Sequence, residues 1–79
     1  ENEQLAKSIV LYPNPVKDIL FINTKLELIK VEIYSLLGNK IKELTTGLNS
    51  IETNSLSRGI YIVKIYSENK LATLKIIKN

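Results

Sequence analysis

A small all-β protein built from two facing sheets is the fold that the sequence predicts. Several segments alternate apolar and polar residues with a period of two, which is the spacing of a half-buried strand. These segments recur about every 8–12 residues and are separated by turn signals rich in glycine, proline, asparagine and serine. The chain has 79 residues, of which 44% are hydrophobic and 24% are charged. That length and composition suit one folded domain with a thin core.

Two short strands are expected at the start of the chain. The apolar segment Ile9–Tyr12 stops at Pro13. Because proline has no N–H to donate to a ladder, this segment suits an edge strand that ends in a turn. The segment Asp18–Asn23 contains an uninterrupted apolar run, which is typical of a strand that is covered on both faces.

A hairpin is expected in the middle of the chain. Residues 29–34 alternate apolar and polar side chains, and the apolar ones are β-branched, which favours a strand. Gly38 and Asn39 tolerate positive φ and predict the turn into a second strand over residues 40–44. A helix over residues 25–37 is the alternative, because the leucines and isoleucines there partly fit a helical period.

Three more strands complete the pattern. Residues 50–54 predict a short polar strand, residues 60–67 the strongest strand, and residues 71–78 the last one. About seven short, mainly antiparallel strands then form two sheets, as in an immunoglobulin-like sandwich. The core residues expected between the sheets are Leu11, Leu20, Ile22, Val31, Ile33, Ile41, Leu56, Tyr61, Val63, Ile65, Leu74 and Ile76.

The reactive groups that most enzymes need are missing. The sequence contains neither cysteine nor histidine, so a Ser-His or Cys-His pair, a disulfide and a thiolate metal site are excluded. No glycine-rich phosphate loop follows a predicted strand. The spacing of the acidic residues indicates solvated surface charge. The sequence therefore predicts no enzyme, no cofactor and no metal site.

Nucleic-acid and membrane binding are also not favoured. The net charge of +3 is spread along the chain, which indicates a soluble surface more than a nucleic-acid footprint. Tyr34 and Tyr66, with Lys30 and Lys64 in the same strands, could stack bases, but outward tyrosines also support sheet packing, which is the favoured interpretation. No apolar stretch approaches the ~20 residues of a membrane-spanning helix, so no direct membrane insertion is expected.

Several short patterns follow one another along the chain. They are VLYPNP at residues 10–15, DILFI at 18–22, VEIYSLLGNKI at 31–41, LSRGIYIV at 56–63 and ATLKIIK at 72–78. In this order they resemble the type A C-terminal sorting domain of the type IX secretion system of Bacteroidetes. The resemblance covers residues 9–78, and its specificity comes from the order of the patterns more than from any one of them.

The resemblance implies that the domain is an address for a larger exported protein. Residues 9–79 would form the sorting domain, and residues 1–8 would be the end of a linker from an upstream cargo domain. Its partners would be an outer-membrane secretion translocon and a sortase-like protease that removes the domain in or before the linker. The protein would pass through the periplasm and then be secreted or held at the cell surface.

The resemblance also implies which residues the translocon recognises, namely Tyr12, Pro13, Asn14, Pro15, Gly59, Tyr61, Lys75 and Lys78. The alternative for most of these is a role in the fold alone: the prolines fix φ, Asn14 can bond its own backbone in a turn, and a buried Tyr61 needs a hydroxyl partner. Lys75 and Lys78 lie where few folding demands are expected. The alternative for both is a charged edge strand that blocks aggregation, and such an edge could also add to a partner sheet.

Two points stay open at this stage. Leu36 and Leu37 stand in the hairpin turn, where many members of the family carry polar residues; if they are exposed, they form a small apolar patch that could contact the translocon. An immunoglobulin-like binding or adhesion module and a structural spacer of a multidomain secreted protein are the alternative functions, because sandwiches host many functions.

Overall fold

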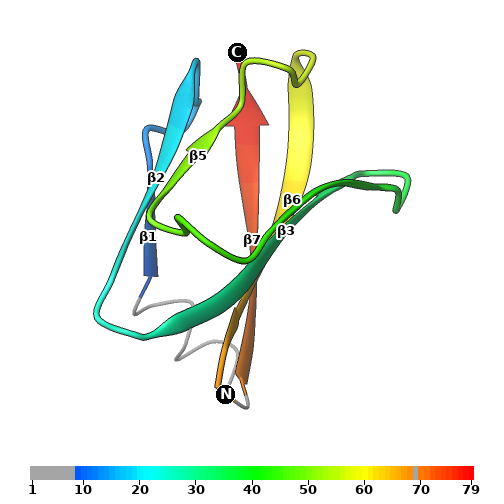
Figure 1. Ribbon diagram of the computed structural model, residues 1–79. Helices are drawn as coiled ribbons and strands as arrows, with labels where there is room; N and C mark the ends of the chain where they lie inside the picture. Colours follow the sequence, from blue (N-terminus) through cyan, green and yellow to red (C-terminus); the bar gives the residue numbers. More distant parts are fainter. Residues whose placement is uncertain (1–8, 69) are drawn as a thin grey trace.

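The computed structural model of the protein describes residues 9–68 and 70–79. The predicted linker, residues 1–8, lies outside the described residues. Within the described part of the chain, no helix is long and apolar enough to cross a membrane. The strands, whose arrangement Figure 1 shows, are β1 (Ile9–Tyr12), β2 (Ile19–Thr24), β3 (Leu28–Ser35), β4 (Lys40–Leu44), β5 (Ser50–Glu52), β6 (Gly59–Ser67) and β7 (Lys70–Lys78).

The strands form two sheets that face one another. The order is β1-β2-β5 in the three-stranded sheet and β4-β3-β6-β7 in the four-stranded sheet, and all of these neighbours pair antiparallel. Figure 1 shows the two sheets as separate layers. The predicted sandwich is therefore confirmed. The helical alternative over residues 25–37 is wrong, because β3 is strand over most of that segment.

The core lies between the inner faces of the two sheets. Most of the predicted core residues belong to it, while Leu11 and Leu74 pack against it and are only partly buried. Burial of such side chains is the main stabilising contribution of a domain of this size. The buried apolar residues are Ile9, Val16, Leu20, Ile22, Val31, Ile33, Leu48, Ile51, Leu56, Tyr61, Val63, Ile65, Ala72 and Ile76.

The prediction that Ile41 belongs to the core is wrong. In the β3–β4 ladder, Ile33 pairs with Lys42 and the next residue, Tyr34, pairs with Lys40, so the register shifts between them. Ile41 is the extra residue of this bulge and its side chain is exposed. Lys42 and Leu44 pair with the core residues Ile33 and Val31, so the inner face of β4 carries these two and Ile41 falls on the outer face. The alternation within β4 does not reveal which of its faces is turned toward the core.

The loop between β1 and β2, which are neighbours in one sheet, reaches across to the other sheet. Pro13 and Pro15 follow β1, and the peptide bonds that precede both prolines are cis. Neither proline can donate a backbone hydrogen bond. Val16 has an N–H again, and it forms a parallel bridge with Lys78 at the end of β7. This loop therefore brings the first part of the described chain against the last strand.

Candidate functional site

The segments that carry the predicted recognition residues meet at one end of the sandwich. Gly59 pairs with Lys78 and Tyr61 with Ile76, which places the start of β6 beside the end of β7. The loop after β1 lies against the same part of β7. We call this surface the motif end; it consists of residues 12–17, 57–61 and 75–79. In Figure 1 the motif end is at the top, beside the C-terminus, and β1 begins at the other end.

Asn14 and Val16 hold the outer edge of β7 through four hydrogen bonds. The Asn14 Oδ1 atom accepts from the N–H of Ile77 at 2.9 Å, and its Nδ2 atom donates to the Lys75 carbonyl at 3.5 Å. The N–H of Val16 donates to the Ile77 carbonyl at 2.7 Å, and the Val16 carbonyl accepts from the N–H of Asn79 at 2.8 Å. We call these contacts the β7 clasp.

An asparagine side chain can act in the clasp because it offers one carbonyl acceptor and an N–H₂ donor, as a peptide group does. It therefore extends the ladder at a position where the flanking Pro13 and Pro15 have no N–H. The prediction that Asn14 bonds its own backbone is wrong, since its partners are in β7. β7 is an edge strand of its sheet, as the sequence analysis considered, and the clasp occupies the edge at its C-terminal end.

Lys78 is a structural part of the motif end. Only 8% of the residue is exposed. Its Nζ atom donates to the carbonyl of Lys17 at 2.7 Å and to that of Asn79 at 3.1 Å. A buried ammonium group is tolerated only when such acceptors replace water. The expectation that few folding demands act on Lys78 is therefore wrong, whereas the side chain of Lys75 is exposed.

Tyr61 and Gly59 shape the loop that leads into β6. The ring of Tyr61 is buried, and its hydroxyl donates to the Ser57 carbonyl at 2.7 Å. The expected hydroxyl partner is thus confirmed. Gly59 has a φ of 151°, a conformation that L-residues with a side chain rarely adopt. A Cβ atom added there would meet nothing within 4 Å, so the backbone conformation alone explains the glycine.

The remaining predicted residues lie on the surface. The Tyr12 ring stacks on that of Phe21, with 5.4 Å between the ring centroids. The structure therefore divides the predicted recognition set into two groups. The exposed residues are Tyr12, Pro13, Asn14, Pro15, Gly59 and Lys75, and the buried ones are Tyr61 and Lys78.

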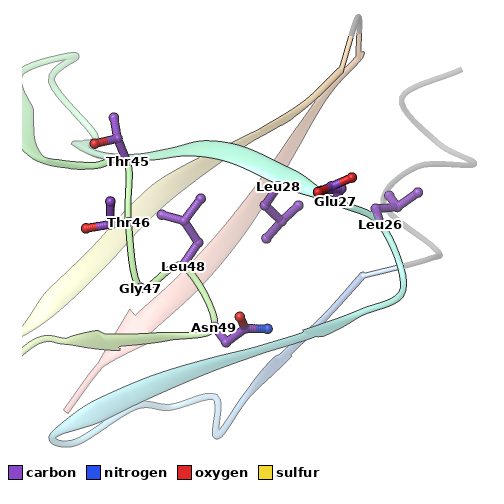
Figure 2. A pocket seen from close by; sticks show the side chains of 8 residues that line it. All are labelled: Leu26, Glu27, Leu28, Thr45, Thr46, Gly47, Leu48 and Asn49. Atoms are coloured by element: carbon purple, nitrogen blue, oxygen red, sulfur yellow. The ribbon is translucent and has the colours of Figure 1, made fainter.

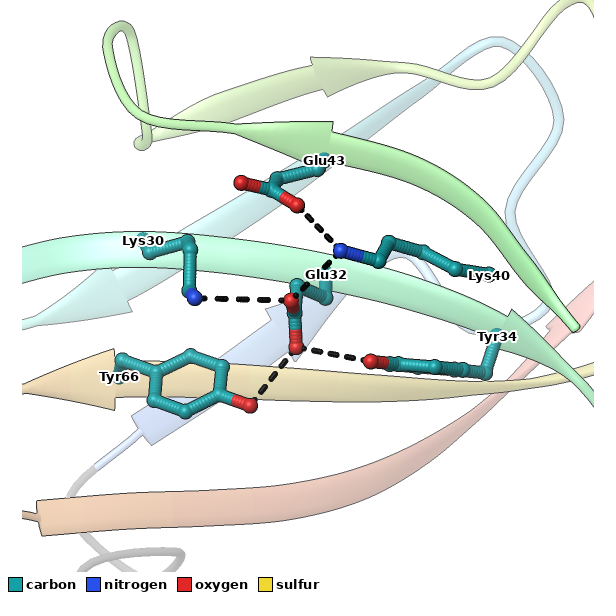
Figure 3. A network of polar contacts seen from close by, with 6 residues as sticks. All are labelled: Lys30, Glu32, Tyr34, Lys40, Glu43 and Tyr66. Atoms are coloured by element: carbon teal, nitrogen blue, oxygen red, sulfur yellow. Dashed lines mark hydrogen bonds and ion pairs between the residues drawn. The ribbon is translucent and has the colours of Figure 1, made fainter. Parts of the chain in front are cut away.

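Sequence reasoning missed a polar network on the outer face of the four-stranded sheet (Figure 3). Its centre is the buried carboxylate of Glu32 in β3. One carboxylate oxygen accepts from the hydroxyl of Tyr66 at 2.7 Å and from that of Tyr34 at 3.1 Å. The other accepts from the Lys40 Nζ atom at 3.2 Å and lies 3.6 Å from the Lys30 Nζ atom. Lys40 also pairs with Glu43.

These contacts fix the charge of Glu32. The hydrogen bond from Tyr66, with smaller contributions from Lys40, Tyr34 and Lys30, outweighs burial and lowers the pKa of Glu32 to about 2. The same hydrogen bond, together with burial, raises the pKa of Tyr66 to about 12. Both groups keep one protonation state near neutral pH. Such a network suits a structural role more than acid–base catalysis.

The tyrosines that could have stacked bases are covered by lysines. The Lys30 Nζ atom lies 4.5 Å from the centre of the Tyr66 ring, and the Lys64 Nζ atom lies 4.7 Å from that of Tyr34. These are cation–π distances. Because one face of each ring is already occupied, the arrangement favours sheet support, as the sequence analysis did.

A shallow hollow of about 340 Å³ lies between the β2–β3 and β4–β5 loops. Figure 2 shows Leu28 and Leu48 pointing into the space between the loops. No histidine or cysteine lines it, and no group of three or more acidic residues that could hold a metal ion occurs within residues 9–68 and 70–79. The residues around the hollow are Leu26, Glu27, Leu28, Thr45, Thr46, Gly47, Leu48 and Asn49.

The turn between β3 and β4 is apolar and exposed. Leu37 is 90% exposed, and Leu36 is exposed as well. The condition of the sequence-based hypothesis, that both leucines are on the surface, is thereby met.

Comparison with known proteins gives two matches and one negative result. The family model described as "Secretion system C-terminal sorting domain" matches residues 10–79. A solved structure of PorZ, described as an essential bacterial surface component of the type-IX secretion system of Porphyromonas gingivalis, is 17% identical, with a TM-score of 0.70. The match covers 94% of this chain and 12% of that one. This chain therefore shares the fold of one part of a much longer protein. No curated protein matches.

Proposed function

The chain belongs to the family of secretion system C-terminal sorting domains, and from this premise we propose that it directs a larger protein through the type IX secretion system. The family assigns a non-catalytic sorting role, which agrees with a sequence that lacks histidine and cysteine. The type IX route is supported by the sequence resemblance and by the fold shared with part of PorZ.

The observation that carries the proposal is the contact between Asn14 and Ile77. It joins the first and the last of the sequence patterns, which are far apart in the chain, into one surface at the motif end. A surface of this kind exists only when the domain is folded. The domain therefore acts as a folded address, read by another protein.

Within this proposal the recognition residues have two different roles. The exposed ones, among them Pro13, Pro15 and Lys75, are available for direct contact with the translocon. The buried residues Tyr61 and Lys78 act by holding the loops of the motif end in place.

The partners follow from the same role. An outer-membrane translocon would read the motif end, and a sortase-like protease would cut in or before residues 1–8. The described chain starts at Ile9, at the end of the sandwich away from the motif end (Figure 1). A cargo domain upstream would thus leave the motif end accessible. The protein would pass through the periplasm on its way to the cell surface or the medium.

A fusion tests this function. Residues 1–79 are attached to the C-terminus of a fluorescent protein that carries a signal peptide, and fluorescence is measured in the periplasm and outside the cell. We expect export in a strain with the type IX system and periplasmic retention in a strain without it. Retention of the folded fusion in both strains would contradict the function.

A further inference from the structure

The outer face of the three-stranded sheet carries an exposed apolar patch. Val10 and Tyr12 project from β1 and Ile19 and Phe21 from β2, and all four side chains are exposed. We call this patch the β1–β2 face. The sequence indicated that the strand over residues 18–23 is covered on both faces, but the described part of the domain covers only the inner one.

The fold itself does not require apolar residues at outward strand positions. On the other sheet, the outward positions of the central strands β3 and β6 include Lys30, Glu32 and Lys64, which are engaged in polar and cation–π contacts. Exposed isoleucines occur on that sheet as well, namely Ile29, Ile41, Ile60 and Ile77. The β1–β2 face differs because it carries a stacked aromatic pair and because no charged residue stands at the outward positions of β1 and β2. Contiguous exposed apolar patches mark interaction sites.

Two aromatic rings form the centre of the patch. Tyr12 and Phe21 are directly paired across the two strands, and their rings are stacked at 5.4 Å with an angle of 25° between the ring planes. Each ring thus holds the other in place before any partner arrives. Aromatic side chains that are fixed in this way lose little conformational entropy on binding and are enriched at protein interfaces.

The size and charge of the patch identify the kind of partner. A stable dimer buries roughly 800 Å² on each partner, contributed by about 20–30 residues, which four side chains do not supply. The remaining outward positions of this sheet are Asn23, Ser50 and Glu52. None is basic, so the strands offer no attraction to anionic lipid headgroups. The kind of partner that fits both the size and the charge of the patch is an apolar surface of another protein, bound only briefly.

We propose that the β1–β2 face is a transient docking surface for an apolar patch on a protein component of the secretion machinery. The proposal rests on the sorting function. The β1–β2 face adjoins the motif end at Tyr12, so the surface that the secretion machinery binds would extend beyond the motif end. A contact of this size is weak enough to dissociate. The secretion machinery could then release the domain after each exported molecule.

The test compares matched substitutions on the two outer faces within the fluorescent fusion. Phe21→Ser and Val10→Ser change the β1–β2 face. Ile41→Ser and Ile29→Ser change the four-stranded sheet, outside the motif end, at positions of similar exposure: 39% for Phe21 and 46% for Ile41, 52% for Val10 and 53% for Ile29. Melting temperatures by circular dichroism accompany each export ratio, so that loss of folding is recognised.

We expect Phe21→Ser to lower the ratio of exported to periplasmic fluorescence about tenfold, as truncation of an aromatic anchor does. Val10→Ser should lower it less, and both controls should match the unchanged fusion. Equal ratios for all variants, while the unchanged fusion is exported, would overturn the docking surface and leave the sorting function intact. A concentration-dependent dimer or sedimentation with phosphatidylglycerol vesicles, lost in Phe21→Ser, would also overturn it. Retention of the unchanged fusion would instead contradict the sorting function.

Discussion

The side-chain carbonyl of Asn14 accepts a hydrogen bond from the backbone N–H of Ile77, 63 positions later in the chain, at 2.9 Å. This contact replaces a strand neighbour that β7 lacks on its outer edge. Unpaired edges promote aggregation, and natural proteins cover or blunt them. The contacts of the Tyr12–Val16 segment thus cover the edge of β7 and also form part of the motif end.

Replacement of Asn14 by alanine should destabilise the domain. The Ile77 N–H and the Lys75 carbonyl would lose their side-chain partner, at a cost of about 0.5–1.5 kcal/mol. In a domain of this size each kcal/mol lowers the melting temperature by roughly 4–8 °C. Asn23→Ala, at an exposed outward position of β2, is the control and should leave the melting temperature nearly unchanged. Equal melting temperatures for both variants would contradict the role of the clasp.

Replacement of Lys78 should lower the stability of the domain, whereas replacement of Lys75 should not. Lys78→Met keeps most of the side-chain volume but removes the ammonium that the carbonyls of Lys17 and Asn79 accept from. We expect a loss of about 1–3 kcal/mol, measured by urea unfolding. Lys75→Met changes an exposed side chain and should stay within about 0.5 kcal/mol of the unchanged domain. A larger effect at Lys75 than at Lys78 would be inconsistent with the observed burial.

Gly59 offers a test of backbone conformation without a change in packing. Its φ of 151° is unfavourable for L-alanine, and a Cβ atom there would have open space around it. We expect Gly59→Ala to cost about 1 kcal/mol in thermal unfolding. D-Alanine at the same position, introduced by chemical synthesis, should restore the stability because D-residues favour positive φ. If D-alanine were as damaging as L-alanine, a packing effect would be the better explanation.

The Glu32 network should make stability depend on acid in a defined range. The pKa of Glu32 is lowered from 4.5 to about 2 in the folded state. A lowered pKa means that its contribution is complete above pH 4.5 and is lost as the pH falls toward 2. The difference in unfolding free energy between the unchanged domain and Glu32→Gln should be constant near neutral pH and shrink between about pH 5 and pH 2. A constant difference over that range would show that the carboxylate charge is not what the network stabilises.

Tyr66 should give the opposite response at alkaline pH. Its pKa is raised from 10.0 to about 12, mainly by its hydrogen bond to Glu32. A raised pKa adds stability that is complete below pH 10 and is lost as the pH rises toward 12. Tyr66→Phe should therefore approach the unchanged domain in stability over that range. The measurement is urea unfolding at fixed pH values from 9 to about 12.

The exposed Leu36 and Leu37 turn should affect export more than folding. Neither leucine belongs to the buried core, so replacement of both by serine should leave the melting temperature nearly unchanged. If the turn contacts the translocon, the double variant should be exported less well in the fluorescent fusion. A large loss of stability instead would assign the turn to core packing.

The sequence predicted the strands well because their periodicity is local. The alternation in residues 29–34 and 60–67 needs only neighbouring positions, and both segments are strands. Ile41 was misplaced because the alternation of residues 40–44 does not show which face is turned toward the core, and the pairing with β3 decides it. Buried residues outside regular strands, such as Val16 and Leu48, were missed because loop positions have no period. Thr53 lies in the segment predicted as a short polar strand, but it follows β5 and is held in the interior by its bonds to the Asp18 carbonyl.

The sequence could predict which residues belong to the candidate site, but not what each of them does there. Short patterns identified Asn14, Tyr61 and Lys78, yet the sequence could not tell which side chains face solvent. The burial of Lys78 depends on the bridge between Val16, in the loop after β1, and the end of β7, which brings the Lys17 carbonyl within reach. Contacts of this kind arise only from the folded topology.

The most direct test of the central claim, that the motif end is the surface read during export, compares two exposed lysines at opposite ends of β7. Lys75→Ala changes the motif end, and Lys70→Ala changes the far end of the same strand. The ratio of exported to periplasmic fluorescence is measured for both variants of the fusion at equal melting temperature. We predict a clear fall for Lys75→Ala and no change for Lys70→Ala. Equal export of the two variants, or a fall for Lys70→Ala alone, would contradict it.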